Sequence, residues 1–122
     1  RQISLHETVA VVDERCELFP NNFFQCGRAL DILSACPKTV GIDILLRTMG
    51  PDTIAVDEIT AATDCNSLIH AAWCGVRLLA TAHASSINDF RNRPVYRPLL
   101  ENNLFHTLVI LNRNNTYTVE RI

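Results

Sequence analysis

The most regular hydrophobic pattern in the chain is residues 51–59, an apolar run that ends in two adjacent carboxylates, Asp57 and Glu58. A run this short and this apolar predicts a parallel β-strand that is buried on both faces. In open α/β sheets, ligands bind at the carboxyl ends of such strands. The two acids are therefore predicted at the ligand-binding edge of a sheet, although a strand exit with two solvated acids, or a helix N-cap, has the same pattern.

Two further apolar runs also end in polar side chains. Residues 8–15 end in Asp13, Glu14 and Arg15, and residues 76–83 end in His83. Parallel strands finish at one edge of a sheet, so we expect both pairs of acids to line one cleft and His83 to reach the same edge. Like charges gathered in this way repel one another, and a bound divalent cation relieves that repulsion. The alternative is that Glu14 and the residue after it only enter a solvated loop.

Helical patterns occupy segments between these predicted strands. Residues 40–49 are amphipathic and stop at a glycine and a proline, and a cap at Thr63 or Asp64 starts a helix that runs to about residue 74. Two β-like runs, 105–111 and 117–122, flank an Asn-rich turn and predict a hairpin. The remaining pieces are an irregular segment at 16–27, a segment at 28–36 with too few apolar residues for a helix, a short helix at 87–91 capped by Ser85 or Ser86, and a helical or irregular piece at 94–102. This alternation predicts a doubly wound α/β domain, with a mostly parallel sheet flanked by helices and a C-terminal β-hairpin.

Length and composition limit the classes of protein. The chain has 122 residues, 48% of them hydrophobic, and a formal net charge of −2, which suits one small domain with a buried core. With no basic excess, bulk electrostatic binding to nucleic acid is not expected. No apolar stretch approaches the length of a membrane span and the N-terminus has no signal-peptide pattern. We therefore expect a soluble protein whose contact with a membrane goes through a partner.

The cysteines argue against disulfides and against a metal centre. They are scattered singly, without a CxxC pair, at Cys16, Cys26, Cys36, Cys65 and Cys74. In an α/β pattern this odd number predicts reduced, mostly buried thiols of a cytoplasmic protein. No Cys or His pair has zinc spacing, so a structural zinc site is not expected.

The run at 51–59 has the form of a Walker B strand, and this form gives its two acids different tasks. Asp57 would hold the water shell of a nucleotide-bound Mg²⁺, and Glu58 would orient and polarise the water that attacks the γ-phosphate. His83, at the same edge, would hydrogen-bond the γ-phosphate or the attacking water and so sense the phosphate, unless it is structural. Arg47, in the last turn of the helix at 40–49, either complements the helix dipole or faces nucleotide from this or a neighbouring subunit.

Three stretches, in this order and spacing, resemble the RecA-like secretion ATPases, in which an acidic box, a Walker B strand and a histidine box follow the P-loop. They are Val-Val-Asp-Glu-Arg at 11–15, Arg-Thr-Met-Gly-Pro-Asp-Thr-Ile-Ala-Val-Asp-Glu-Ile at 47–59 and Ala-Thr-Ala-His-Ala-Ser-Ser at 80–86. The best match is the stage III sporulation protein AA family, which the segments at 27–28, 31–33, 36–38 and 91–94 also resemble. The resemblance covers nearly all of the chain and implies a RecA-like P-loop NTPase core.

Two departures from the family pattern stand out. No Gly-x-x-x-x-Gly-Lys-Ser/Thr occurs in the chain, and in the family that P-loop lies shortly upstream of a position like Arg1. The backbone amides and lysine of the loop anchor the phosphates, so we expect negligible ATP hydrolysis by residues 1–122 alone. After Ile59, Thr-Ala-Ala-Thr stands where a Gly-Arg and acidic residues are usual.

The first departure also bears on the fold. Residues 1–122 are expected to form a single partial RecA-like domain, in which the Walker B strand and the histidine box are present while the Walker A loop and its strand are absent. That first strand is central in the architecture, so its absence is expected to leave unpaired backbone groups and a poorly stable piece.

The resemblance implies a Mg²⁺- and ATP-dependent motor of a sporulation secretion system. Such a protein would work in the mother-cell cytoplasm as a homo-oligomeric ring, expected to be a hexamer, at a channel between mother cell and forespore. Its partners would be ATP and membrane channel proteins of the sporulation complex, with no nucleic acid. Glu14 would add a second acidic group to the site of Asp57, Glu58 and His83. Arg28 or Arg47 would neutralise transition-state charge, an effect worth about 10³ to 10⁵ in rate.

Two other functions fit the sequence. One is a non-catalytic assembly module, a RecA-like domain that docks channel proteins and hydrolyses nothing, which the absent P-loop favours for this chain. The other is an acidic pocket like that of response regulators, which requires a lysine at a strand end. Lys38 is the only lysine and follows a proline in a predicted loop, so the pattern disfavours this third interpretation.

Overall fold

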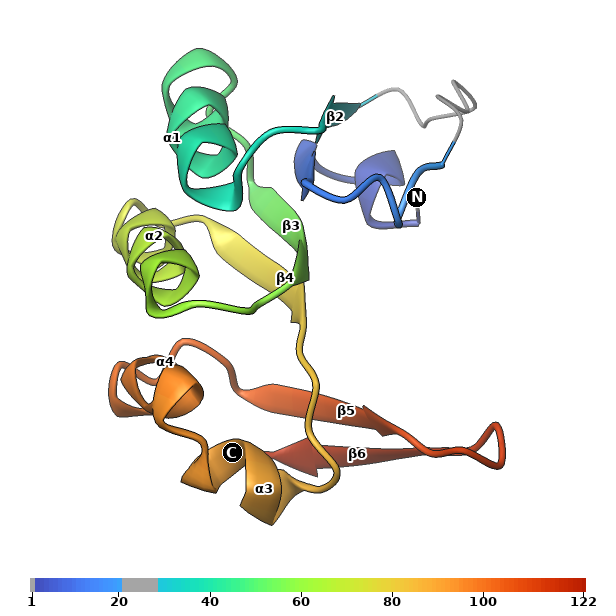
Figure 1. Cartoon of the computed structure of the whole chain (residues 1–122). Helices are drawn as coiled ribbons and strands as arrows, with labels where there is room; N and C mark the ends of the chain where they lie inside the picture. The colour runs from blue at the N-terminus through green and yellow to red at the C-terminus, as the bar shows by residue number, and fades with distance from the viewer. Residues whose placement is uncertain (1, 21–28) are drawn as a thin grey trace.

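The computed structural model describes residues 2–20 and 29–122 (Figure 1). In this part of the chain the elements are, in order, η1 (Ile3–Leu5), β1 (Val9–Asp13), β2 (Leu30–Ser34), α1 (Lys38–Thr48), β3 (Thr53–Glu58), α2 (Ala62–Trp73), β4 (Arg77–Thr81), α3 (Ile87–Asn92), η2 (Pro94–Tyr96), α4 (Arg97–Glu101), β5 (Thr107–Leu111) and β6 (Tyr117–Arg121).

Four strands form a parallel sheet in the order β2-β1-β3-β4, and β5 and β6 form a separate antiparallel hairpin. β1 is buried along its whole length and β3 along all but its last residue, whereas the edge strand β4 alternates between exposed and half-buried positions. This is the burial that continuous apolar runs predict for strands with a neighbour on both sides. The predicted α/β class, with a mostly parallel sheet, flanking helices and a C-terminal hairpin, is therefore confirmed.

Several local boundaries differ from the sequence-based expectations. The segment at 28–36, for which no element was predicted, contains the edge strand β2, which pairs with β1. α1 begins at Lys38, two residues before the predicted start. Ser86 caps α3 as expected, because its Oγ accepts a hydrogen bond from the backbone N–H of Asp89 at 3.1 Å. At α2 the cap comes from inside the first turn, where Asp64 Oδ2 accepts the backbone N–H of Ala61 at 3.0 Å.

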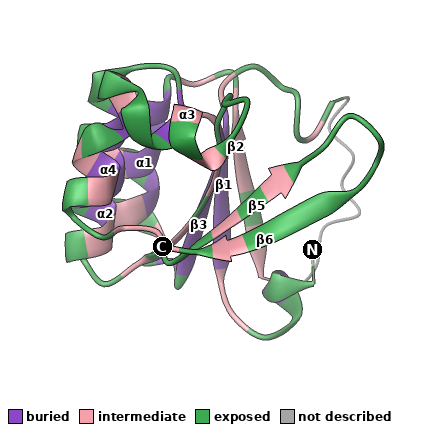
Figure 2. Ribbon diagram, turned by 90° about the horizontal axis from the view of Figure 1, so that it is seen from below, coloured by how far each residue is buried: buried purple, intermediate pink, exposed green. Residues whose placement is uncertain are grey.

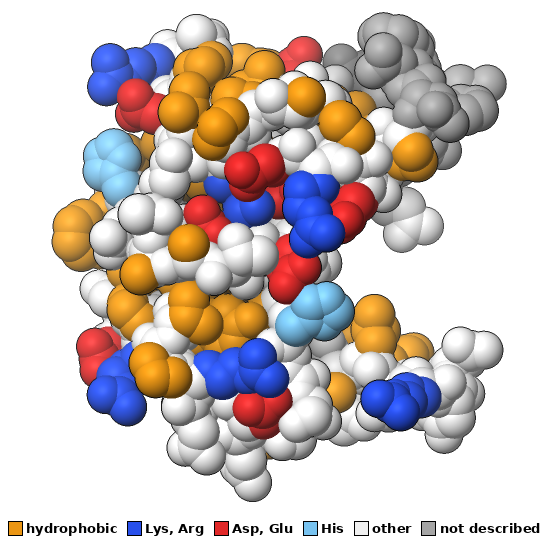
Figure 3. Space-filling model, in the orientation of Figure 1, with side chains coloured by type: hydrophobic (Ala, Val, Ile, Leu, Met, Phe, Trp, Pro, Cys, Tyr) orange, Lys and Arg blue, Asp and Glu red, His pale blue; other side chains and the backbone are white. Residues whose placement is uncertain are grey.

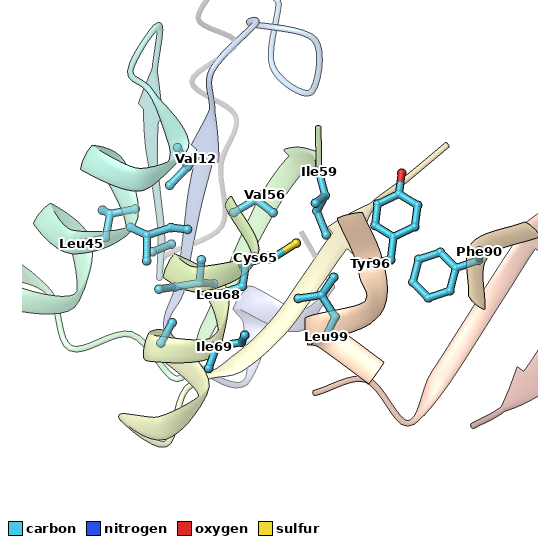
Figure 4. Close-up of a cluster of buried hydrophobic side chains, with 14 residues drawn as sticks. Val12, Leu45, Val56, Ile59, Cys65, Leu68, Ile69, Phe90, Tyr96 and Leu99 are labelled. Carbon is cyan, nitrogen blue, oxygen red and sulfur yellow. The ribbon is translucent and has the colours of Figure 1, made fainter. Parts of the chain in front are cut away.

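Both long helices cover the same face of the sheet (Figures 1 and 2). α1 and α2 pack against each other and against the central strands, and Figure 4 shows the buried side chains between them. These include Val12, Leu45, Val56, Leu68 and Ile69. The core continues through Phe90, Tyr96 and Leu99 into α3, η2 and α4. A doubly wound domain has helices on both faces, so within the described residues that part of the prediction is wrong.

The opposite face of the sheet carries a smaller apolar cluster. Val9, Val11 and Ala55 are buried there and pack against the half-buried side chains of Phe19, Leu30 and Ile32. Loop and edge-strand side chains, rather than a helix, cover this face in the described part of the chain.

The edge of the sheet at β4 is open. Within the described residues β4 pairs only with β3, and the β5–β6 hairpin lies on the β4 side of the sheet without joining it (Figure 1). Large apolar side chains are exposed on these strands, namely Leu79, Val109, Leu111, Tyr117 and Val119. In the described residues, the four-stranded sheet and the hairpin are therefore two separate sheets, and the β4 edge of the first is unpaired.

The cysteines correct another expectation. Among the four that the structure describes, Cys65 is buried, Cys36 is half-buried, and Cys16 and Cys74 are exposed, and none forms a disulfide. Cys16 lies in the turn after β1, where its φ is 55°, and it is exposed. The thiols are free as predicted, but the prediction that most are buried is wrong for these four.

At Gly41, α1 lies close against the sheet, and this position provides a test of the packing. A Cβ atom at this position would lie 2.7 Å from Val12 Cγ1 and 3.3 Å from Leu33 Cδ2. We predict that Gly41→Ala lowers the free energy of unfolding by about 1–3 kcal/mol because the added methyl overpacks the core. At an open helix position the same change would instead stabilise by up to about 1 kcal/mol.

Chemical denaturation of both proteins measures this difference. Asn66→Ala, at an exposed position of α2, is the control and should change the free energy of unfolding by less than about 0.5 kcal/mol. A Gly41→Ala protein as stable as the parent would contradict the close approach of α1.

Candidate functional site

The acids that follow β1 and β3 meet at the carboxyl edge of the sheet. Glu14 Oε2 and Asp57 Oδ1 both accept a hydrogen bond from Lys38 Nζ, at 2.6 and 2.8 Å. Glu58 Oε2 lies 3.7 Å from Nε2 of His83, which follows β4. Figure 3 shows acidic, basic and histidine side chains gathered across the middle of this face. The structure thus brings four of the predicted site residues to one edge, as expected for parallel neighbouring strands.

Asp57 reaches this position through an irregularity at the end of β3. Val56 lies opposite Ala80, but Glu58 lies opposite Thr81, so β3 has one residue more than β4 at this point. Such bulges re-aim side chains next to functional sites. Here the Asp57 side chain is turned inward and is 2% exposed, whereas the Glu58 side chain is 21% exposed. The two adjacent acids therefore have different environments.

Lys38 is the buried cation of the site. It is the first residue of α1, and its side chain is 1% exposed between the two carboxylates. Burial alone lowers the pKa of a lysine, but the hydrogen bonds and charges of Asp57 and Glu14 outweigh it, and the pKa of Lys38 lies above its usual 10.5. Lys38 is therefore an ammonium ion that neutralises part of the acidic cluster.

Arg15 supplies a second positive charge. Its guanidinium contacts Glu58 Oε2 at 3.2 Å and Glu17 Oε1 at 3.1 Å, and its backbone N–H donates to Asp57 Oδ2 at 3.1 Å. Both carboxylate oxygens of Asp57 are thus engaged, one by Lys38 and one by this backbone group. The repulsion expected among the acids is relieved by two side chains of the chain itself.

Neither cation was predicted from the sequence to belong to the site. The expectation that Lys38 lies in a loop is wrong, since it opens α1 directly after Pro37. The signal for Lys38 was its position at a helix start near the predicted strand ends. The signal for Arg15 was its place directly after Glu14.

Asp13 does not line the cleft that was expected for it. It is fully buried, and its carboxylate accepts backbone N–H groups of Glu17, Leu18 and Phe19 at 2.9, 3.1 and 2.8 Å. Charge-assisted bonds of this kind fix a turn tightly. Asp13 therefore shapes the loop that carries Glu14, and it does not join the other acids at the carboxyl edge of the sheet.

Of the two predicted arginines, the structure describes Arg47, which lies away from the cluster. Arg47 lies in the last turn of α1, about 14 Å along the helix axis from Lys38, and its guanidinium pairs with Asp43 at 3.1 Å. An action of Arg47 on nucleotide held by this chain is disfavoured by that distance, and an action on a neighbouring subunit stays a prediction. Arg28 lies outside the described residues.

The segment after His83 is held in place on both sides. Tyr96 Oη donates to the backbone carbonyl of His83 at 3.2 Å, while the imidazole itself is exposed. Asp89 Oδ2 accepts the backbone N–H and the hydroxyl of Ser85 at 2.7 and 3.0 Å, and both carboxylate oxygens also accept from Arg93 at 2.9 Å. The backbone of His83 is thus fixed, and its ring is free to meet a ligand.

The donor set suits a cation that brings its own ligands. In the described part of the chain, no group of three or more His, Cys, Asp or Glu side chains is placed to hold a metal. Mg²⁺ in nucleotide sites takes one or two carboxylates and fills its coordination with water and phosphate oxygens. Glu14 and Asp57 supply two carboxylates, which is the number that a magnesium–nucleotide complex takes and too few for an all-protein metal cage.

Comparison with known proteins places this site in context. The family model described as "Sporulation stage III, protein AA" matches residues 4–121. The stage III sporulation protein AA of Bacillus subtilis (strain 168) is 36% identical over 109 residues, which cover 84% of this chain and 35% of that protein. The X-ray structure of the Legionella pneumophila ATPase DotB has a TM-score of 0.53 at 12% identity, over 93% of this chain and 35% of that chain. The likeness to DotB shows a shared fold, and the chain spans about a third of the curated relative that it matches.

Among the helices described, none has both the length and the apolar composition that a membrane crossing requires.

The network around Asp89 predicts a pH dependence. The hydrogen bonds from Arg93 and Ser85 hold the pKa of Asp89 well below its ordinary 3.8. A carboxyl with a lowered folded-state pKa contributes stability that is complete above the unfolded-state pKa and is lost as the pH falls through the folded-state pKa. We therefore expect Asp89→Asn to be less stable than the parent at pH 6, and the difference to shrink steadily below about pH 4.

Urea denaturation of both proteins at several pH values between 6 and 2.5 measures this difference. A gap that stays constant over this range would show that the Asp89 carboxylate has no special stabilisation. Asp31→Asn, on the edge strand β2, is the control for the general effect of removing one acid.

Proposed function

Because the chain belongs to the stage III sporulation protein AA family, we propose that it is part of the hydrolytic domain of a secretion-type motor ATPase. The observation that carries the proposal is the meeting of Glu14, Asp57, Glu58 and His83 at one sheet edge. These are the residue types that nucleotide hydrolysis requires, at the edge where α/β sheets bind ligands. The shared fold with an ATPase is consistent with it.

The two environments of the adjacent acids suit two tasks. Asp57, buried and engaged at both oxygens, has a fixed carboxylate, and with Glu14 it would hold Mg²⁺. When bound, Mg²⁺ would supply charge stabilisation to phosphate oxygens. Glu58 is more open, so its carboxylate can accept a hydrogen bond from a water molecule and take its proton.

The neighbours of Glu58 complete the proposed site. His83 has an exposed ring close to that carboxylate and can donate a hydrogen bond to a phosphate oxygen, which suits the detection of a γ-phosphate. Arg15 pairs with Glu58 in the described structure, so its guanidinium lies beside the acids of the site. Arg15 would supply positive charge to the site, a role for which Arg28 or Arg47 was expected.

The proposal for the whole protein extends beyond this chain. In this proposal the whole protein acts as a homo-oligomeric ring in the mother-cell cytoplasm, where ATP and membrane channel proteins of the sporulation machinery are its partners. The name of the Bacillus subtilis relative supports the sporulation context. The competing function, a docking module without hydrolysis, is favoured by one observation, the absence of a Gly-x-x-x-x-Gly-Lys motif in the 122 residues.

The phosphate-binding loop in this proposal comes from the part of the protein that precedes the chain. Its strand pairs with the open edge of β4 and lies between β4 and the hairpin. The backbone N–H groups of Arg77 and the carbonyl of Thr81 point toward β3. Since these groups alternate in direction along a strand, the N–H groups of Leu78 and Ala80 point toward the open edge.

Hydrogen exchange tests this strand addition. In a version of the protein that includes the upstream region, the amides of Leu78 and Ala80 are expected to exchange at least about tenfold more slowly than in residues 1–122. Leu79, whose N–H points toward β3, is the internal control and should be protected in both. Equal exchange at Leu78 and Ala80 in the two proteins would remove the added strand from the proposal.

The hydrolytic role is tested in the full-length protein. We predict that Glu58→Gln lowers the Mg²⁺-dependent ATPase rate by about 10²-fold or more, because the amide cannot take the proton of the attacking water. Nucleotide binding should be retained, since Glu58 is not assigned to the phosphates. Phosphate release assays measure the rate, and Glu101→Gln, an exposed acid at the end of α4, is the matched control. Unchanged turnover in Glu58→Gln would take Glu58 out of its assigned role.

A further inference from the structure

Lys38 is the buried cation of the site, and its position is not explained by helix stability. It occupies the first turn of α1, where the positive end of the helix dipole disfavours a cation. A buried ion pair also loses much of its attraction to desolvation, and apolar side chains of similar size often replace such pairs without loss of stability. The position of the lysine is therefore explained by the two carboxylates, whose negative charge it neutralises.

Those carboxylates come from different strands and meet only at Lys38. Glu14 follows β1 and Asp57 ends β3, and no contact between their side chains is needed because each accepts a hydrogen bond from the same nitrogen. In the described residues, these two acids are the charged groups in contact with the ammonium. The lysine thus holds two carboxylate oxygens around one positive charge.

We propose that Lys38 is a positioning residue of the nucleotide site, whose ammonium holds Glu14 and Asp57 together and takes, in the nucleotide-free protein, the place of a divalent cation between them. This inference rests on the proposed assignment of these two acids to Mg²⁺. It adds that, in the nucleotide-free protein, the Lys38 ammonium neutralises negative charge of the Glu14 and Asp57 carboxylates. A cation then enters only with a nucleotide, whose phosphates supply the further ligands and charge.

The consequence is measurable without turnover. In the full-length protein without nucleotide, Mn²⁺ titration followed by electron paramagnetic resonance reports the free ion. Wild type is expected to bind Mn²⁺ weakly. Lys38→Met removes the charge and keeps the apolar stem, and it should bind Mn²⁺ at least about tenfold more tightly, because two close carboxylates then lack a counter-ion.

Three further variants separate charge from packing. Lys38→Arg retains the charge and should bind Mn²⁺ as weakly as wild type. Lys38→Met combined with Asp57→Asn removes one of the two carboxylates and should lose the gained affinity. Arg97→Met, which removes an exposed cation at the start of α4, is the matched control and should behave as wild type.

Each result decides the proposal. Equal Mn²⁺ affinity in wild type and Lys38→Met, or tight binding by wild type itself, overturns it. If Lys38→Met unfolds on its own, a thermal melt that rises with added Mn²⁺ supports the proposal, since the cation then replaces the ammonium. Failure of Mn²⁺ to restore the fold overturns it. The ATPase assay of Glu58→Gln tests hydrolysis separately, so the two proposals can fail independently.

Discussion

The organisation of this site follows from one constraint, the burial of the Asp57 carboxylate. A charged group with almost no exposure needs a cation or several hydrogen bonds, because removal from water costs far more than one neutral contact returns. The chain meets this need twice, with the Lys38 ammonium on one oxygen and the Arg15 backbone N–H on the other. These two contacts tie the start of α1 and the loop after β1 to the end of β3. The positions of Glu14 and of Arg15 beside Glu58 follow from that connection.

The elements that were predicted well from the sequence are the buried strands, because a strand covered on both faces has a continuous apolar run. β1 and β3 lie in the middle of a parallel sheet, so both of their faces are covered, and apart from Thr53 every position is apolar until the acids begin. β2 gave no such signal, because an edge strand with a polar residue at its second position resembles a loop. Helix starts were harder to place for a related reason. Lys38 belongs to the first turn of α1, yet a lysine is an unfavourable residue there, and only the acids of other elements make it acceptable.

The candidate site shows the same division between local and long-range information. The meeting of Asp57, Glu14 and His83 depends on strand direction alone, and strand direction was predictable from the pattern of the runs. The counter-ions were not predictable in this way, since Lys38 lies 19 residues from Asp57 in sequence and reaches it only because α1 packs across β1. Likewise, nothing in the sequence distinguishes Asp13 from Glu14, but the backbone turn after β1 captures the first carboxylate and leaves the second one free to reach the lysine.

The bulge at the end of β3 explains how one strand serves two kinds of carboxylate. In a regular strand, adjacent side chains point to opposite faces of the sheet, and one of two consecutive acids would face the apolar core. The extra residue at Asp57 breaks this alternation, so the Asp57 side chain turns to Lys38. Glu58 stays at the carboxyl edge of the sheet, beside His83 and Arg15. A fixed carboxylate, Asp57, and a more accessible one, Glu58, are thereby placed side by side. The difference in chemistry between them comes from backbone geometry, and the sequence motif alone does not contain it.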